Sequence, residues 1–191
     1  MELHFKGDAL AFLPMATNFF EGGTSLSDIR VVLGGTRSQL KIISGIANIE
    51  RGEMWMKEVA PHIHDINGKI ELKEGTNQVN FVDLKASVKN KSITFNTVRD
   101  ITLANGRELK HWYFNTLDLD FGIVSIRTEQ GGVELNLPGL MTKEDAGSLY
   151  LTGKDAGEMF YFAGPVKHPL AYGAVTLYDA RLTYPFLKSE T

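Results

Sequence analysis

Hydrophobic and polar residues alternate along most of this chain, and the stretch HIHDINGKIEL at residues 62–72 shows the pattern clearly. Ile66, Ile70 and Leu72 occupy one set of alternate positions, and mostly charged or polar residues occupy the other. Because successive side chains of a strand point to opposite faces, the stretch predicts a half-buried β-strand. Its apolar side could face a packed core, a metal held by the two histidines of the stretch, or a ligand.

The same alternation recurs in other segments, which turn-forming residues separate at intervals of about ten residues. The segments are 28–33, 82–88, 92–95, 117–123, 133–137, 160–162 and 175–177. The intervening turn signals include EGTN, NK, NG, QGG and DAG. Short alternating strands with regular turns are typical of an all-β protein, so the sequence predicts that fold class.

We expect one exception to the all-β pattern, a short helix near the N-terminus. Asp8 could cap a helix through residues 9–20, since aspartate is a favoured N-cap residue. Pro14 would break or kink such a helix in its middle.

Two segments of the chain resemble each other. GGTRSQLKIISGIANIERGEMWM begins at Gly34, and AGPVKHPLAYGAVTLYDARLTYP begins at Ala163. Each reads as a glycine-marked turn, a strand, a tight turn (ERG or YDA) and a second strand. Repeats of this kind stack into quasi-one-dimensional structures. We therefore expect residues 1–191 to form a single β-repeat unit that is a fragment of a longer protein.

Composition narrows the classes of function. The net charge is −3 and the charges are interspersed, which gives no reason to expect nucleic-acid binding. There is no cysteine, so disulfides and thiolate metal sites are excluded. The apolar run at residues 9–16 is much shorter than the roughly 20 residues of a membrane span.

Few residues of the sequence are candidates for metal binding or catalysis. His62 and His64 share a strand face as H-x-H, but a zinc site needs three or four ligands and no further ligand lies nearby in sequence. We therefore expect no bound metal. Neither a phosphate-binding loop motif nor a G-x-S-x-G nucleophile motif occurs, so we expect no catalytic residues, no cofactor and no enzyme activity.

The repeated segments, together with the strand DINGKIEL, resemble the C-terminal repeat region of the TamB family of AsmA-like bacterial envelope proteins. Glycine, a proline five residues later, a second glycine, an alternating strand and a final proline make up the family pattern. Gly164, Pro169, Gly173 and Pro185 match it. Leu40 stands in place of the proline in the first copy.

The resemblance implies a "β-taco", an elongated curled sheet with an open hydrophobic groove. It also implies a periplasmic location in a double-membraned bacterium, within a parent protein anchored in the inner membrane. The implied partners are phospholipid acyl chains and an outer-membrane barrel protein. The implied function is phospholipid transport between the two membranes and support of outer-membrane protein assembly, without any catalytic residue.

On this hypothesis the apolar strand positions line the lipid groove. They are Ile66, Ile70, Leu72, Val82, Leu84, Ile93, Phe95, Leu117, Leu119, Phe121, Ile123, Val133, Leu135, Leu137, Phe160, Phe162, Val175 and Leu177. The alternative is a closed β-sandwich that serves as a structural scaffold, because a sandwich core uses the same residue types.

Overall fold

The computed structural model describes residues 1–16, 20–36, 39–56, 62–103, 105–110, 120–134, 146–152, 159–165 and 168–181. The N-terminal elements are β1 (Glu2–Gly7), η1 (Leu10–Phe12), α1 (Leu13–Ala16), β2 (Phe20–Thr36), β3 (Gln39–Met56), β4 (Ile63–Leu72), β5 (Val79–Val88) and β6 (Lys91–Val98). The remaining strands are β7 (Asp100–Thr102), β8 (Glu108–Lys110), β9 (Asp120–Thr128), β10 (Val133–Glu134), β11 (Ala146–Thr152), β12 (Phe160–Pro165), β13 (Leu170–Tyr172) and β14 (Ala174–Arg181).

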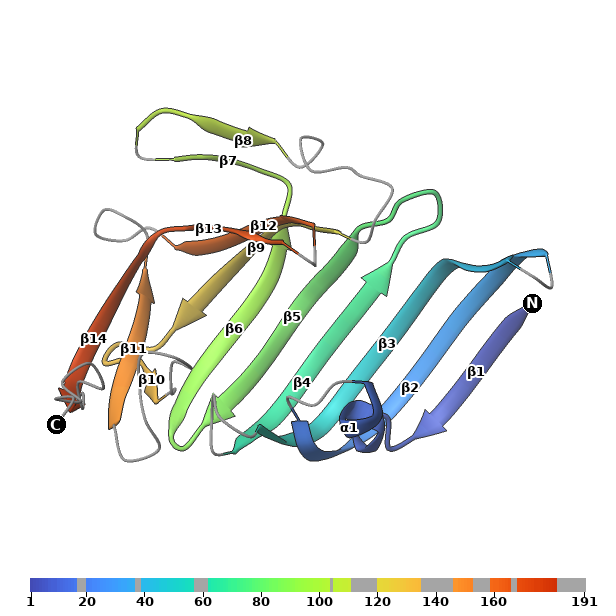
Figure 1. Cartoon of the computed structure of the whole chain (residues 1–191), viewed down its shortest axis with the longest axis horizontal. Coiled ribbons are helices and arrows are strands. Elements are labelled where there is room, and N and C mark those ends of the chain that lie inside the picture. Colours follow the sequence, from blue (N-terminus) through green and yellow to red (C-terminus); the bar gives the residue numbers. More distant parts are fainter. Residues whose placement is uncertain are drawn as a thin grey trace, which may run out of the picture.

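A nine-stranded antiparallel sheet dominates the molecule, in the order β1-β2-β3-β4-β5-β6-β9-β12-β13 (Figure 1). The first six strands lie in the order of the sequence, β6 also pairs with β9, and the sheet does not close on itself. A three-stranded sheet, β10-β11-β14, and a hairpin, β7-β8, complete the described strands. The sequence prediction of an all-β fold built on an open, curled sheet is confirmed.

The N-terminal helical segment is shorter than the sequence predicts. A 3-10 turn at Leu10–Phe12 leads into α1, which ends at Ala16, and β2 has already begun at Phe20. Pro14 lies in the first turn of α1, where a missing backbone N–H costs no helical hydrogen bond. Asp8 Oδ1 accepts hydrogen bonds from Ala11 N at 3.1 Å and from Ser25 N at 2.8 Å. It thereby caps the turn and fastens it to β2.

Bulges interrupt the ladders of successive strands. Arg51 in β3, Asp65 in β4 and Asp83 in β5 adopt left-handed conformations, with φ of 50°, 53° and 48°, at or beside shifts in strand register. Gly122 in β9 has φ of 57°. An extra residue in one strand bends that strand and increases its twist. A bulge on strand after strand therefore gives the sheet its curl.

Side chains satisfy the backbone amides that these bulges release. Asn67 Oδ1 accepts from Arg51 N at 2.9 Å, and Asn96 Oδ1 accepts from Asp83 N at 2.7 Å. Asp120 Oδ1 likewise accepts from Gly122 N at 2.6 Å. The bond at Gly122 is buried, where an amide without a partner is costly, so Asp120 stabilises the ladder there. The two bonds at Arg51 and Asp83 are exposed and hold the conformation of their bulges.

The bulges also correct part of the repeat hypothesis. The sequence reading places tight turns at ERG and YDA, but Arg51 lies inside the 18-residue strand β3. YDA lies inside β14. Of the two NG dipeptides, Asn105-Gly106 lies in the turn between β7 and β8, whereas Asn67-Gly68 lies within β4. A left-handed residue can therefore form a bulge as well as a turn, and the sequence signal is similar for both.

The two faces of the large sheet differ in chemistry. The inner face, as we call it, contains Ile49, Ile66, Ile93 and the other members of the main hydrophobic core. The outer face is mostly polar along β1 and β2, with Leu26 and Val32 as exposed hydrophobic exceptions. There, Asp28 lies 2.8 Å from His4 Nε2, and this hydrogen bond holds the pKa of Asp28 below its usual range. No helix within the described ranges has both the length and the hydrophobicity needed to cross a bilayer.

Candidate functional site

The structure brings many of the predicted groove residues together on the inner face. Those that belong to the main core or pack against it are Ile66, Ile70, Leu84, Ile93, Phe95, Phe121, Val133, Phe160 and Phe162. Leu72 follows Ile70 on the same side of β4, where it is half-buried and pairs with Val79. Strand alternation therefore does select one common surface for these residues.

Two predicted residues lie on the opposite face. Val82 pairs with Lys69, while the preceding residue, Phe81, pairs with Ile70 on the inner face. Ile123 is completely buried in a separate cluster with Leu109 of β8. In each case a bulge, at Asp83 or at Gly122, reverses the alternation, so the sequence prediction of a shared face is wrong for Val82 and Ile123.

The structure does not place the other predicted residues in the large sheet. Val175 and Leu177 belong to β14 of the three-stranded sheet, and Val175 is 53% exposed. Leu117, Leu119, Leu135 and Leu137 lie outside the described residues.

Exposure along the inner face changes from one end of the sheet to the other. At the β6-β9-β12 end, Ile126 is 2% exposed and Phe160 is 7% exposed. At the β1 edge, Leu3 and Phe5, which pair with Val31 and Ile29, are 48% and 40% exposed. The apolar surface therefore continues from a closed core to an edge where large hydrophobic side chains meet solvent.

Two elements cover parts of the inner face. Val133 of β10 is fully buried against the main core. Near the other end, Leu10 of η1 packs on the core beside Gly52, where an added Cβ would lie 3.0 Å from Leu10 Cδ1 and 2.9 Å from Ile66 Cβ. Glycine at position 52 therefore lets η1 approach the sheet closely.

The two histidines of β4 and its approach make contacts with neighbouring side chains and backbone. The His62 ring stacks on Trp55 with centroids 5.1 Å apart, and His62 Nε2 lies 3.1 Å from Glu53. His64 Nδ1 lies 2.7 Å from Asp65 Oδ2, and His64 Nε2 lies 2.7 Å from the Lys89 carbonyl oxygen. Within the described ranges, no group of three His, Asp or Glu side chains could hold a metal ion.

His64 faces oxygen acceptors at both ring nitrogens. A carboxylate and a carbonyl can only accept, so the imidazolium form, which donates from both nitrogens, satisfies both contacts. The hydrogen bond with Asp65, followed by that with the Lys89 carbonyl, raises the pKa of His64. His64 thus joins the start of β4 to the turn between β5 and β6.

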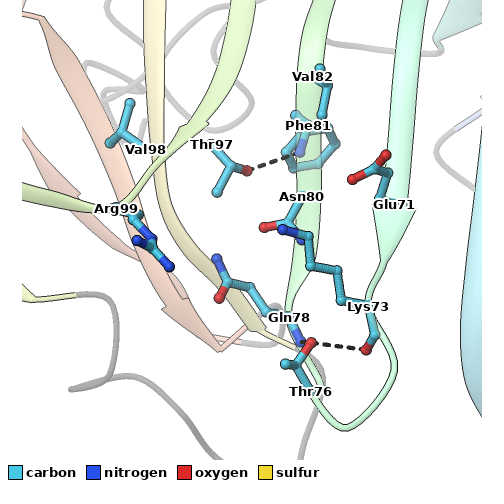
Figure 2. A pocket seen from close by; sticks show the side chains of 10 residues that line it. All are labelled: Glu71, Lys73, Thr76, Gln78, Asn80, Phe81, Val82, Thr97, Val98 and Arg99. Atoms are coloured by element: carbon cyan, nitrogen blue, oxygen red, sulfur yellow. Dashed lines mark hydrogen bonds between the residues drawn. The ribbon is translucent and has the colours of Figure 1, made fainter.

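A cleft opens where β5 and β6 diverge. Their backbone ladder extends only from Val88↔Lys91 to Leu84↔Phe95, and beyond it Thr97 Oγ1 accepts from Phe81 N at 2.9 Å. The resulting cavity has a volume of about 300 Å³. Its lining residues are Glu71, Lys73, Thr76, Gln78, Asn80, Phe81, Val82, Thr97, Val98 and Arg99 (Figure 2).

Sequence reasoning missed this cleft. Its lining residues come from two segments, 71–82 and 97–99, which the rest of β5 and most of β6 separate. Single polar residues near strand ends carry no pattern that distinguishes them from solvated turns. The only local signal is the cationic residue just beyond each strand end, Lys73 after β4 and Arg99 after β6.

Comparison with known proteins adds no assignment to this geometry. No family model, no curated protein and no solved structure matches the chain.

Proposed function

We propose that this chain binds lipid acyl chains on the inner face of its curled sheet, as a periplasmic segment of a TamB-like protein that bridges the inner and outer membranes. In that setting the apolar inner face conducts phospholipid, and the parent protein supports outer-membrane protein assembly with an outer-membrane barrel partner. The single observation that supports acyl-chain binding is the apolar surface that runs from the buried core to the exposed Leu3 and Phe5.

Two physical arguments favour a lipid over solvent on this surface. An acyl chain is bound through apolar contacts, which inner-face residues such as Ile49, Ile66 and Ile70 offer. Contiguous exposed apolar surface on a protein commonly marks a binding site. The mostly polar outer face offers no such surface, because Lys6 and Arg30 surround Asp28 there at 3.2 and 3.7 Å.

A structural scaffold is the second candidate. The observation that favours it is the complete burial of Val133, which places β10 over the inner face like part of a second sandwich layer. On this hypothesis the inner face serves only to pack the protein's own layers, and the exposed β1 edge has no lipid ligand.

Fatty-acid binding distinguishes the two candidates. We expect the purified chain to retain phospholipid in native mass spectrometry and to bind a fluorescent fatty acid. Leu3→Asp should weaken fatty-acid binding several-fold, because it places a charge on the exposed part of the apolar path. The matched control is Val32→Asp, since Val32 is 36% exposed and pairs with Glu2, on the other face from Leu3.

The control should bind the fatty acid like the wild-type chain. A lipid-free chain that binds no fatty acid would contradict the lipid proposal and favour the scaffold. Equal weakening by both substitutions would show that the inner face is not the site.

A further inference from the structure

We propose that the cleft between β5 and β6 is a binding site for a phosphate ester of a small organic group. This site lies apart from the apolar path of the proposed function and does not depend on acyl-chain binding. The observations that support it are the end of the β5–β6 ladder at this point, the charges of the lining and the distribution of polar and apolar groups within it.

Side-chain hydrogen bonds keep β5 and β6 apart at the cleft. Strands that diverge normally leave backbone amides unpaired, which favours reclosure of the ladder. Here the side chains of Asn96 and Thr97 accept from Asp83 N and Phe81 N at 2.7 and 2.9 Å. Each side chain fills the space of a missing backbone acceptor, so β5 and β6 are kept apart at no cost in unsatisfied amides.

The start of β9 lies behind Gln78 and supports this lining residue. Asp120 N donates to the Asn77 carbonyl at 3.0 Å, which brings the start of β9 beside the start of β5. Gln78 then lies directly on Gly122, where an added Cβ would be only 2.2 Å from the Gln78 amide nitrogen. The glycine therefore allows the Gln78 side chain to form a wall of the cleft. The buried Asp120 carboxylate is engaged by Gly122 N at 2.6 Å.

The charge of the lining is positive. Lys73 and Arg99 form no ion pair within the described part of the chain. Glu71 is the acidic lining residue, and its carboxylate is paired with Lys69 Nζ at 2.6 Å. Two cations therefore face the cleft while its carboxylate is already neutralised, so the site attracts an anion.

The arrangement of donors favours phosphate over a carboxylate. The Arg99 guanidinium approaches from the β6 side, and the amides of Gln78 and Asn80 approach from β5 (Figure 2). Lys73 adds a second cation from the far side of β5. A guanidinium fork with a nearby ammonium and amide donors suits a group with three or four oxygen atoms.

The remaining lining indicates an organic substituent on the phosphate. Phe81, Val82 and Val98 form an apolar part of the wall. The cavity volume of about 300 Å³ exceeds the need of an inorganic ion and leaves room for a group such as glycerol. Such a phosphate ester could come from a phospholipid headgroup or from a soluble organophosphate.

Isothermal titration calorimetry of the full chain tests the proposal, with sn-glycerol 3-phosphate, inorganic phosphate and acetate as ligands. We expect glycerol 3-phosphate to bind at one site per chain, more tightly than inorganic phosphate, with acetate weakest. Arg99→Gln and Lys73→Met should each raise the Kd for glycerol 3-phosphate by about tenfold, since each removes one charged donor. The matched control is Arg127→Gln, an exposed arginine of β9 that pairs with Thr94 away from the cleft.

Vesicles distinguish the two sources of the phosphate. If the wild-type chain sediments with phosphatidylglycerol vesicles and Arg99→Gln does not, the ligand is a lipid headgroup. If the chain binds glycerol 3-phosphate but does not sediment with the vesicles, the ligand is a soluble organophosphate. Absence of glycerol 3-phosphate binding would overturn the proposal, as would acetate binding as tight as that of glycerol 3-phosphate, or wild-type affinity for glycerol 3-phosphate in both cleft variants. Both substituted side chains are exposed, so the variants should melt like the wild type. The effect of Leu3→Asp on fatty-acid binding is a separate measurement, and neither outcome of it changes the result of this test.

Discussion

The two ends of the large sheet use the same alternating sequence pattern in different ways. At the β6-β9-β12 end, inner-face side chains such as Val124 and Ile126 are 3% and 2% exposed because β10 and neighbouring strands cover them. At the β1-β2 end, inner-face side chains such as Leu3 and Phe5 are 48% and 40% exposed. The closed end therefore stabilises the fold, and the open end leaves large apolar side chains in contact with solvent.

This difference shows why alternation alone does not separate a core from a binding surface. The hydrophobic contribution of a residue scales with the area it removes from water, about 25 cal/mol per Å². Leu3 and Ile126 have similar sequence surroundings, but only Ile126 removes nearly all of its surface from water in the folded chain. Substitutions at the two ends should therefore differ in cost.

A buried charge gives the largest expected contrast. Ile126→Asp places an uncompensated carboxylate among Ile93, Val124 and Phe160, and should destabilise the chain by about 4 kcal/mol or unfold it. Leu3→Asp should cost about 1 kcal/mol or less, because its carboxylate remains hydrated. Urea denaturation of both variants measures the two costs. Equal costs would contradict the division into a closed and an open end.

Truncation of matched isoleucines gives the next largest contrast. Ile66 is 4% exposed and Ile42 is 56% exposed. Ile66→Ala should lower the free energy of unfolding by about 2–5 kcal/mol through lost burial and a residual cavity. Ile42→Ala should change it by less than about 0.5 kcal/mol. Thermal and urea unfolding of the pair would reveal whether the exposed position is in fact packed.

A substitution at Gly122 tests the cause of the reversed side-chain alternation in β9. Gly122→Ala introduces a Cβ 2.2 Å from the Gln78 amide at a φ of +57°, so we expect a loss of about 2 kcal/mol. Gly106→Ala is the matched control, because Gly106 has a φ of +76° and no atom within 4 Å of an added Cβ. The control measures backbone strain alone. A cost no greater for Gly122→Ala than for the control would mean that the contact with Gln78 is unimportant.

A pH effect at His64 is the smallest contrast that we expect. The folded chain raises the pKa of His64, so its protonated form contributes stability that is fully present below about pH 6.5. That contribution is lost as the pH rises through the folded pKa. Between pH 6 and pH 8.5, the melting temperature of the wild type should therefore fall by more than that of His64→Gln. Parallel pH profiles for the two proteins would exclude the contribution.

Sequence reasoning found most of the fold because period-two alternation directly reports the face of each strand. It placed Ile66, Ile93 and Phe160 correctly on one surface. It failed at Val82 and Ile123 because one inserted residue changes every later side chain of a strand to the other face. Gly122 gives a hint of such a bulge in the sequence, whereas Asp83 resembles any other polar strand residue.

The candidate site could be predicted only in part for a related reason. The apolar surface follows from local pattern, but the exposure of Leu3 depends on whether another layer covers β1. The cleft with Lys73 and Arg99 depends on where β5 and β6 stop pairing. Neither property is encoded within a short window of sequence.

The consecutive pairing of β1 to β6 has a consequence for how the chain acquires its structure. Each of these strands meets a partner that is adjacent along the chain, so the entropic cost of closing each loop is small. Proteins dominated by such local pairings fold faster than those with distant ones. Hairpins from β1 to β6 can therefore form in order as the chain leaves the ribosome or a membrane channel, before β9, β12 and β13 have arrived.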